Sequence, residues 1–303
     1  MASHAVNYRG ILAMIGGSAC FAANDTATKF AAQYLPVTEI VAVRAGFALV
    51  IALIVIAWRR ELMAIAAIRN PYLILRGCIE AFIGILVVYA LSKMPIANFT
   101  AIILIQPFVM TAIGALWLKE HVGWRRWTAV VAGFAGMLLV MKPATADFEL
   151  VSLVALLAAL LSLTRDLLVR RIHAQVPTTV ITFSTALFAV PLGLMGAAVQ
   201  PWEMPDAVSL LAIVISAAFL FVAFILTVLA FRGTDVSAVS PFRYSIIVFA
   251  FVFGVVVFGE IPDFVSLIGI GMIVAAGLYM LHRERIRRRD QPDGTATTAD
   301  PAA

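Results

Sequence analysis

The sequence predicts an all-α polytopic membrane protein of ten transmembrane helices, arranged as two inverted five-helix repeats with both termini in the cytoplasm. Three observations lead to this prediction. Of the 303 residues, 63% are hydrophobic and 13% are charged, and the mean hydropathy is +1.02, which is not the composition of a soluble protein. Long apolar runs follow one another through most of the chain. The two halves of the chain also match each other at a nearly constant offset.

Each predicted helix is an apolar run long enough to cross a hydrocarbon core about 30 Å thick, which takes about 20 residues. The runs are joined by short loops, so consecutive helices are expected to be antiparallel neighbours. Gly17 stands where a lipoprotein signal has an aliphatic residue, so the first run is expected to be a retained helix. The predicted spans cover residues 9–32, 37–58, 71–92, 95–118, 124–142, 150–172, 177–200, 207–231, 236–258 and 262–282.

The orientation follows from the positions of lysine and arginine. Loops on the side of the N-terminus hold most of the bases outside the spans, whereas the loops on the opposite side hold only Lys93 and Lys142. Short cytoplasmic loops carry an excess of positive charge. The sequence therefore predicts a multi-pass protein of the cell (inner) membrane with cytoplasmic N- and C-termini.

An internal repeat is visible when the chain is compared with itself. An offset of 141 residues aligns Asp25 with Asp166 and Lys29 with Arg170, and an offset of 140 aligns Glu120 with Glu260. Five helices per copy make the second copy enter the membrane from the opposite side, as in many secondary transporters. The predicted units are an N-terminal cytoplasmic segment, a first repeat, a linker, a second repeat and a basic, then disordered tail, at residues 1–8, 9–142, 143–149, 150–282 and 283–303.

Two related segments carry a resemblance to a known family. The stretch from Leu116 to Gly123 reads Leu-Trp-Leu-Lys-Glu-His-Val-Gly, and its counterpart from Val257 to Ile261 reads Val-Phe-Gly-Glu-Ile, without the bases. With ten spans and a five-helix duplication, the chain resembles the drug/metabolite transporter superfamily, EamA type, over residues 10–282. The resemblance implies secondary transport. Similar proteins move amino acids, nucleoside or vitamin-like metabolites, S-adenosylmethionine and drugs.

Ionisable residues inside the spans form two predicted clusters. The outer cluster contains Asn24 and Asp25, with Lys29 one helical turn further on, at a spacing that favours an acid–base pair. Arg44 belongs to it, because Asp25 and Arg44 lie about equally far from the bend of the first hairpin. The inner cluster contains Arg76 and Glu80, also four residues apart, together with Arg165, Asp166 and Arg243.

Two interpretations of these clusters remain open. Charges inside a membrane either form structural ion pairs or mark a transport pathway. Polar residues near Pro107 and Pro241 in the fourth helix of each copy, Gln106 and Tyr244, extend the candidate cavity, and Pro107 is expected to kink its helix. The candidate substrate-binding or gating residues are Asn24, Asp25, Lys29, Arg44, Arg76, Glu80, Gln106, Arg165, Asp166, Arg243 and Tyr244.

These features favour a secondary transporter of a small polar or amphiphilic metabolite. The mixed charges, with a slight excess of base, suit a solute with at least one anionic group, such as an amino acid, or one with many hydrogen-bonding atoms. The resemblance implies a substrate of the amino-acid, nucleoside or vitamin-like, or S-adenosylmethionine class. A multidrug or toxic-metabolite exporter of the same fold is the alternative. An enzyme is not expected, because the four histidines lie in predicted loops or at helix ends and no metal-ligand, nucleophile or phosphate-binding motif is present. A channel is less favoured, because inverted repeats favour alternation.

The expected partners are the small-molecule substrate and membrane lipid. No cofactor or metal is expected. No nucleic acid is expected either, because the bases lie in short loops and one tail rather than on a basic face. A coupling proton or counter-substrate and a homodimer are left open.

Overall fold

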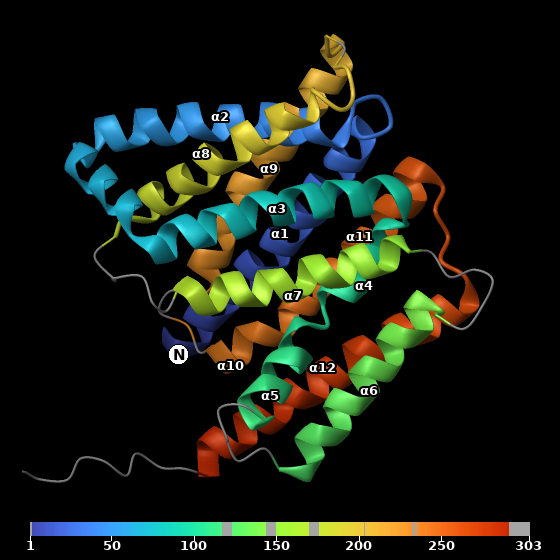
Figure 1. Cartoon of the computed structure of the whole chain (residues 1–303). Coiled ribbons are helices and arrows are strands. Elements are labelled where there is room, and N and C mark those ends of the chain that lie inside the picture. The colour runs from blue at the N-terminus through green and yellow to red at the C-terminus, as the bar shows by residue number, and fades with distance from the viewer. Residues whose placement is uncertain are drawn as a thin grey trace, which may run out of the picture.

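The computed structural model describes residues 2–116, 123–143, 150–169, 176–202, 204–231, 234 and 236–290. Every element in this part of the chain is a helix (Figure 1). The elements are α1 (Ala2–Ala31), α2 (Val37–Trp58), η1 (Leu62–Arg69), α3 (Pro71–Lys93), α4 (Ile96–Ile103), α5 (Gln106–Leu116), α6 (Trp124–Met141), α7 (Val151–Val169), α8 (Thr178–Gly196), α9 (Ala207–Phe231), α10 (Val236–Val239), η2 (Ser240–Tyr244), α11 (Ser245–Phe258) and α12 (Phe264–Asp290).

Within the described residues, eight segments are long and apolar enough to cross a membrane. The prediction of an all-helical chain with many membrane-spanning helices is therefore confirmed, while the number ten stays a prediction. Helices α1 and α6 are not among the eight. The first contains the polar stretch around Asp25, and the second begins with Arg125 and Arg126.

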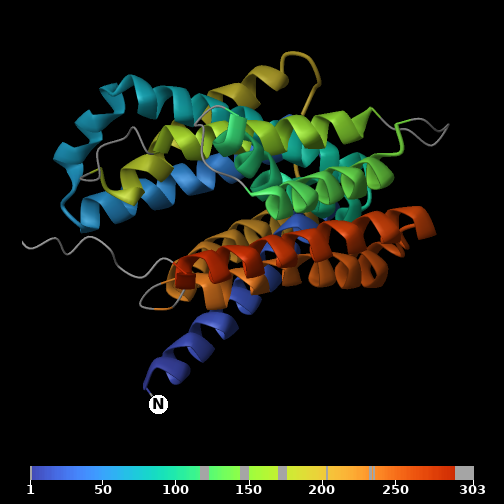
Figure 2. The same cartoon turned by 90° about the horizontal axis from the view of Figure 1, so that it is seen from below.

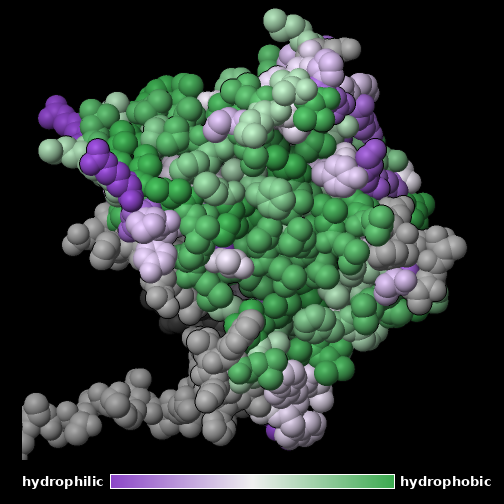
Figure 3. Space-filling view, viewed as in Figure 1, coloured by the Kyte–Doolittle hydropathy of each residue, from purple (hydrophilic) through white to green (hydrophobic). Residues whose placement is uncertain are grey.

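The surface agrees with a lipid environment. Figure 3 shows a broad hydrophobic face, with hydrophilic side chains gathered mainly toward its edges. Helix α9 illustrates this pattern, because large apolar side chains such as Phe221 and Val228 are exposed along it. An apolar face of this extent would be costly in water and needs no further partner in a bilayer.

Local sequence sets several helix ends. Asn70 accepts a hydrogen bond from the Tyr72 amide at 2.9 Å, and Pro71 occupies the first turn of α3, where its missing N–H costs nothing. At the other end of the chain, α12 continues to Asp290, so the basic segment after residue 282 begins as helix. Residues 291–303, where a disordered tail was predicted, lie outside the described part.

The fourth and ninth predicted spans are interrupted. Helix α4 stops at Ile103 and α5 starts at Gln106, immediately before Pro107, which cannot donate a backbone hydrogen bond. In the ninth span, η2 separates α10 from α11 and contains Pro241. At the repeat offset of 140 residues the two interruptions overlap, because residues 104–105 correspond to residues 244–245 and η2 ends at Tyr244. Such breaks leave backbone polar groups available inside a membrane protein.

Helix packing has a similar pattern in both halves. Helix α1 packs against α9 and α11, while α7 packs against α3 and α4. The other major pairs are α2 with α8, α3 with α8, α4 with α11, and α6 with α12 (Figures 1 and 2). Exchanging whole spans for their counterparts in the other half converts most of these pairs into one another; the exception is α3 with α8, whose counterpart, α2 with α9, is a much smaller contact.

A close helix approach joins α6 to α12. A Cβ atom on Gly136 would lie 2.7 Å from the Gly269 carbonyl oxygen, and one on Gly269 would lie 2.5 Å from the Gly136 carbonyl oxygen. Only glycine fits at both positions. Small residues that let two backbones touch are a usual basis of helix association in membranes. This seam lies within one chain.

Candidate functional site

Six ionisable residues on α1, α2, α3 and α7 form what we call the central charge network: Asp25, Arg44, Arg76, Glu80, Arg165 and Asp166. Arg165 is its best-connected member. Its Nη1 donates to both carboxylate oxygens of Glu80, at 3.1 and 2.8 Å, and its Nε donates to Asp166 Oδ1 at 2.9 Å. Hydrogen bonds between two ionised groups are among the strongest in proteins. Arg165 therefore ties α7 to α3.

Arg76 is the second cation beside Glu80. Its Nη2 lies 4.0 Å from Glu80 Oε2, and its Nη1 donates to Thr185 Oγ1 on α8 at 3.0 Å. Its Nε is buried and has no hydrogen-bond partner. Glu80 is thus shared by two guanidinium groups from different helices.

Arg44 is the least satisfied cation of the network. Its guanidinium interacts electrostatically with the carboxylates of Asp25 and Glu80. Among the described residues, it has no hydrogen bond and no carboxylate within 4 Å, although the side chain is half-buried. An arginine presents five N–H donors in a planar fork that matches a carboxylate or phosphate. Arg44 therefore has hydrogen-bond donors that no described residue uses.

A buried polar chain between α1 and α9 holds Asp25. Asn24 Nδ2 donates to Asp25 Oδ1 at 2.9 Å, and Ser216 Oγ donates to Asn24 Oδ1 at 2.8 Å. Thr28 Oγ1 lies 2.8 Å from Ser216 Oγ. The Asn24 amide is thereby fixed in orientation, and through it one oxygen of Asp25 is fixed as well.

The network extends across the apolar thickness of the molecule. Asp25 and Arg44 lie near the end at which α1 finishes and α2 begins, whereas Arg165 and Asp166 lie near the opposite end, where α7 finishes. Glu80 lies between them on α3. Charged groups thus follow one another from one end of the helices to the other.

The two ends of this path differ in exposure. Ala155, Ala159 and Ser162 form a buried stripe along α7, and Asp166 continues that stripe, yet its side chain is 57% exposed. The opposite stripe, which includes Leu153, Leu157 and Leu160, is the apolar one. Asp166 therefore lies on the packed side of α7, yet its side chain is accessible at this end.

The other end carries what we call the Lys29–Glu260 cluster. The Lys29 ammonium pairs with Glu260 and donates to the Met94 carbonyl oxygen at 2.6 Å, and its side chain is only 8% exposed. Glu260 Oε2 also accepts from the Ile96 amide at 3.1 Å. The cluster joins the end of α1 to the α3–α4 turn and to the α11–α12 turn.

The turn after α11 positions Glu260. Gly259 has a φ of +67°, a left-handed conformation that glycine adopts without steric cost, and it ends α11. The next amide, that of Glu260, donates back to the Gly254 carbonyl oxygen at 3.0 Å. The side chain of Glu260 is therefore directed from a defined turn, and it meets the first amide of α4, where a negative charge is favourable.

Lys29 does not pair with Asp25, contrary to the expectation from their spacing. Asp25 is held by Asn24, and the longer Lys29 side chain reaches the α11–α12 turn instead. Glu260 was not among the predicted site residues. Its alignment with Glu120 was the signal that could have identified it. Glu120 and Arg170, the repeat counterparts of this pair, lie outside the described residues.

Three predicted site residues lie outside the network. Arg243 is exposed in η2 and has no ion pair among the described residues. Tyr244 is buried, and its hydroxyl group abuts Gly277 of α12. Gln106 is half-buried at the first position of α5. The structure thus brings seven of the eleven predicted residues together around Asp25 and Glu80, and it places Lys29 in the separate cluster.

A second ion pair lies at the same end as the Lys29–Glu260 cluster. Lys142 Nζ, at the end of α6, lies 2.8 Å from Asp263 Oδ2, at the start of α12. Burial alone would raise the pKa of Asp263, but hydrogen bonds from Lys142 and Ser266 outweigh it and hold that pKa well below its usual range. Asp263 also caps α12 by accepting from the Ser266 amide at 3.1 Å.

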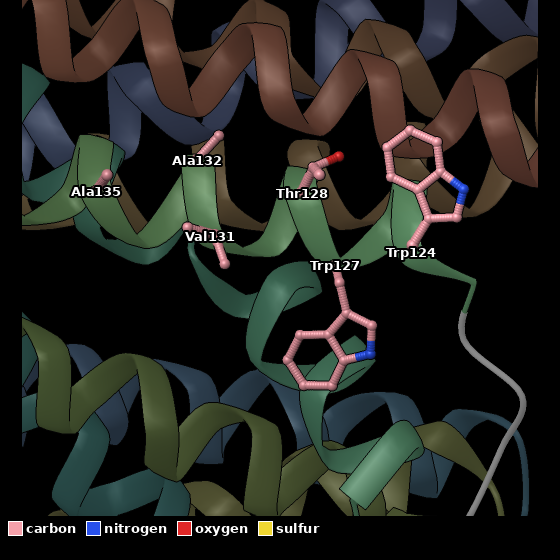
Figure 4. Close-up of a pocket in the computed structure, with 6 residues that line it drawn as sticks. All are labelled: Trp124, Trp127, Thr128, Val131, Ala132 and Ala135. Atoms are coloured by element: carbon pink, nitrogen blue, oxygen red, sulfur yellow. The ribbon is translucent and has the colours of Figure 1, made fainter.

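A hollow of about 490 Å³ lies on α6, away from these charges (Figure 4). Trp124 and Trp127 point to opposite sides of the helix there. The hollow is almost wholly apolar and no predicted site residue lines it, so it offers little to a polar substrate. Its lining residues are Trp124, Trp127, Thr128, Val131, Ala132 and Ala135.

Comparison with known proteins gives matches along most of the chain. An S-adenosylmethionine uptake transporter of Rickettsia prowazekii is 26% identical over 86% of this chain and 88% of its own. A riboflavin transporter of Vibrio cholerae is 27% identical over 93% and 95%, and the pseudopaline exporter CntI of Pseudomonas aeruginosa is 26% identical over 91% and 96%.

A solved crystal structure has the same fold. It aligns with a TM-score of 0.61 and 19% identity over 93% of this chain and 99% of its own. The model of the EamA-like transporter family matches residues 8–142 and again residues 150–281. The family model identifies a transporter rather than an enzyme, and the chain belongs to the EamA-like transporter family.

Proposed function

We propose that the chain moves a small metabolite with an anionic group across the membrane by alternating access, along the central charge network. The observation that carries this proposal is the guanidinium of Arg44, which makes no hydrogen bond among the described residues although it interacts electrostatically with the carboxylates of Asp25 and Glu80. Unused donors on a charged group inside a membrane protein are costly, so a functional ligand is the best reason to retain them.

The chemistry of the site favours a zwitterion. The carboxylate of an amino-acid-like solute would accept from Arg44, and its ammonium group would approach Asp25, whose orientation is set by Asn24. The named relatives take three different metabolites and include both uptake and export, so neither substrate nor direction is carried over from them. A multidrug exporter of cationic compounds is the less favoured candidate, because the unsatisfied group is a base.

The proposed architecture is two inverted repeats of five spans, residues 9–142 and 150–282, with ten spans in all. Two observations support it: most helix pairs have a counterpart when the halves are exchanged, and the interruptions of the fourth and ninth spans overlap at the repeat offset. The distribution of lysine and arginine supports cytoplasmic termini and an inner-membrane location. Arg243 and Gln106 lie at or near the interruptions and would line the path from the cytoplasmic side to the central charge network, which we call the inner approach.

With this topology the described conformation is inward-facing. The cytoplasmic end holds the exposed Asp166, and the outer end holds the closed Lys29–Glu260 cluster. A transporter of this kind must also adopt the opposite state, in which the outer end opens. A coupling proton, a counter-substrate and a dimer are not needed for this proposal.

Uptake into proteoliposomes tests the function. Purified protein is first screened for amino acids, nucleosides and vitamins that raise its melting temperature, and the compounds found are then offered in radiolabelled form. We expect Arg44→Ala to abolish uptake while the protein stays monodisperse, and the exposed loop variant Arg59→Ala to transport normally. Unimpaired uptake by Arg44→Ala would remove Arg44 from the site.

A further inference from the structure

The geometry points to a role for Glu260 that goes beyond substrate binding: we propose that Glu260 and Lys29 form a latch that holds the outer end closed and must separate before it opens. The inference rests on the proposed alternating-access function. Glu260 would then be a positioning residue that sets the balance between the inward-facing and outward-facing states.

The contacts of the pair suit this role. The Lys29 ammonium is buried between the Glu260 carboxylate and the Met94 carbonyl oxygen, and it lies 5.4 Å from the centre of the Phe258 ring. Glu260 accepts from Ile96 as well. Every polar group of the latch is therefore satisfied in the closed state, which a dry interface requires.

The latch crosses the seam that has to open. Lys29 belongs to the first half of the chain and Glu260 to the second, and α1 packs directly on α11. The turn that carries Met94 and Ile96 leads into α4, one interrupted span, while Glu260 follows α11, part of the other. Segments joined to such interruptions can move relative to the rest of their span.

An ion pair is well suited to a contact that must be made and broken. When the seam opens, water replaces each lost contact, because the ammonium, the carboxylate, the carbonyl and the amide are all strongly hydrated groups. An apolar contact of similar size would have to expose its surface to water. The ion pair thus gives the closed state a defined geometry, while hydration of the separated charges limits the free-energy cost of the open state.

The Lys142–Asp263 pair provides a matched control. It lies at the same end, but it joins α6 to α12, whose backbones already touch at Gly136 and Gly269. It is also more exposed, since 46% of the Asp263 side chain is accessible. This seam is held closed independently of the charges, so losing the pair should not open the outer end.

Thiol labelling tests the latch without a known substrate. In a Cys20→Ser/Cys78→Ser background, Met94→Cys reports on the outer end and Arg243→Cys on the inner approach, because Met94 is buried and Arg243 is exposed. A membrane-impermeant maleimide is offered to intact cells for the first reporter and to inside-out vesicles for the second.

We expect the substitution Glu260→Gln to make the labelling of Met94→Cys about tenfold faster and the labelling of Arg243→Cys slower. The reason is that the population moves from the inward-facing to the outward-facing state. The double variant Lys29→Met/Glu260→Gln, which leaves no buried charge unpaired, should give the same shift, and Glu260→Asp should give little. Asp263→Asn should match the parent at both reporters.

Two results would overturn the latch. One is unchanged labelling in both the single and the double variant. The other is faster labelling of Met94→Cys with unchanged labelling of Arg243→Cys, which indicates local loosening only. Failure of the parent protein to transport any metabolite would instead count against the proposed function. The labelling result does not depend on transport, so the two failures can be distinguished.

Discussion

Arg165 on α7 donates from a single nitrogen, Nη1, to both carboxylate oxygens of Glu80 on α3, at 3.1 and 2.8 Å. Arg76 Nη2 lies 4.0 Å from Oε2 of the same carboxylate. Two guanidinium groups thus share one acid, and a third, that of Arg44, interacts with it electrostatically. Glu80 is the point at which the outer and inner charges of the network meet.

Glu80→Gln should therefore damage both stability and transport. Removing the carboxylate leaves Arg76 and Arg165 without the negative charge that they share. Because about a quarter of each side chain of the Glu80–Arg165 pair is exposed, we expect a loss nearer 2 kcal/mol than the 3–5 kcal/mol of a fully buried pair. Chemical denaturation in detergent measures it, and uptake should fall at least tenfold.

A double variant separates the two effects. Glu80→Gln/Arg165→Gln removes one cation together with the acid, so it should recover most of the lost stability without recovering transport. Recovery of transport in the double variant would mean that the pair is structural only.

Asn24→Ala should reduce uptake although Asn24 is not expected to touch the substrate. The asparagine amide fixes Asp25, so its loss would leave the carboxylate free to turn toward Arg44 and occupy the donors meant for the ligand. We expect at least a tenfold higher half-saturation concentration with a smaller change in maximal rate. Thr26→Ala, which removes only a bond to the carbonyl of its own helix, is the control.

Helix positions could be predicted from the sequence because apolar run length and flanking prolines are local signals. Helices α2 and α9 begin and end at the predicted residues, 37–58 and 207–231. The interruption of the fourth span falls where Pro107 was expected to kink it. Helix α1 begins earlier than predicted, at Ala2, because polar residues at a membrane interface can extend a helix without changing the apolar run.

The partner of Lys29 could not be predicted from its neighbours in the sequence. Spacing along one helix pointed to Asp25, but the partner, Glu260, is brought close only by the packing of α1 on α11. Likewise, the link between Arg165 and Glu80 depends on the packing of α7 on α3. The residue types were identifiable because charge inside an apolar run is rare; their pairing is a property of the tertiary fold.

Gly136→Ala should destabilise the contact between α6 and α12. Its new methyl group would lie 2.7 Å from the Gly269 carbonyl oxygen, which cannot move without shifting a helix. Overpacking of this kind costs about 1–3 kcal/mol. Gly271→Ala, on the exposed face of α12 with no atom within 4 Å of its Cβ position, is the matched control. Equal melting temperatures for the two variants would contradict the close approach.

The Lys142–Asp263 pair should make stability depend on pH in acid. The pKa of Asp263 is held well below its usual range in the folded protein, chiefly by Lys142 and Ser266 acting against burial. A group with a depressed folded pKa stabilises the fold above its unfolded pKa, about 3.9 for aspartate, and this contribution is lost as the pH falls toward the folded value.

Below about pH 4 the melting temperature of the wild type should therefore fall by more than that of Asp263→Asn. The two curves of melting temperature against pH should converge as Asp263 is protonated. Lys142→Gln should fall between them, because Ser266 still holds the carboxylate. Parallel curves for the wild type and Asp263→Asn across this range would mean that the pair contributes nothing to stability, in keeping with the small value of many exposed ion pairs.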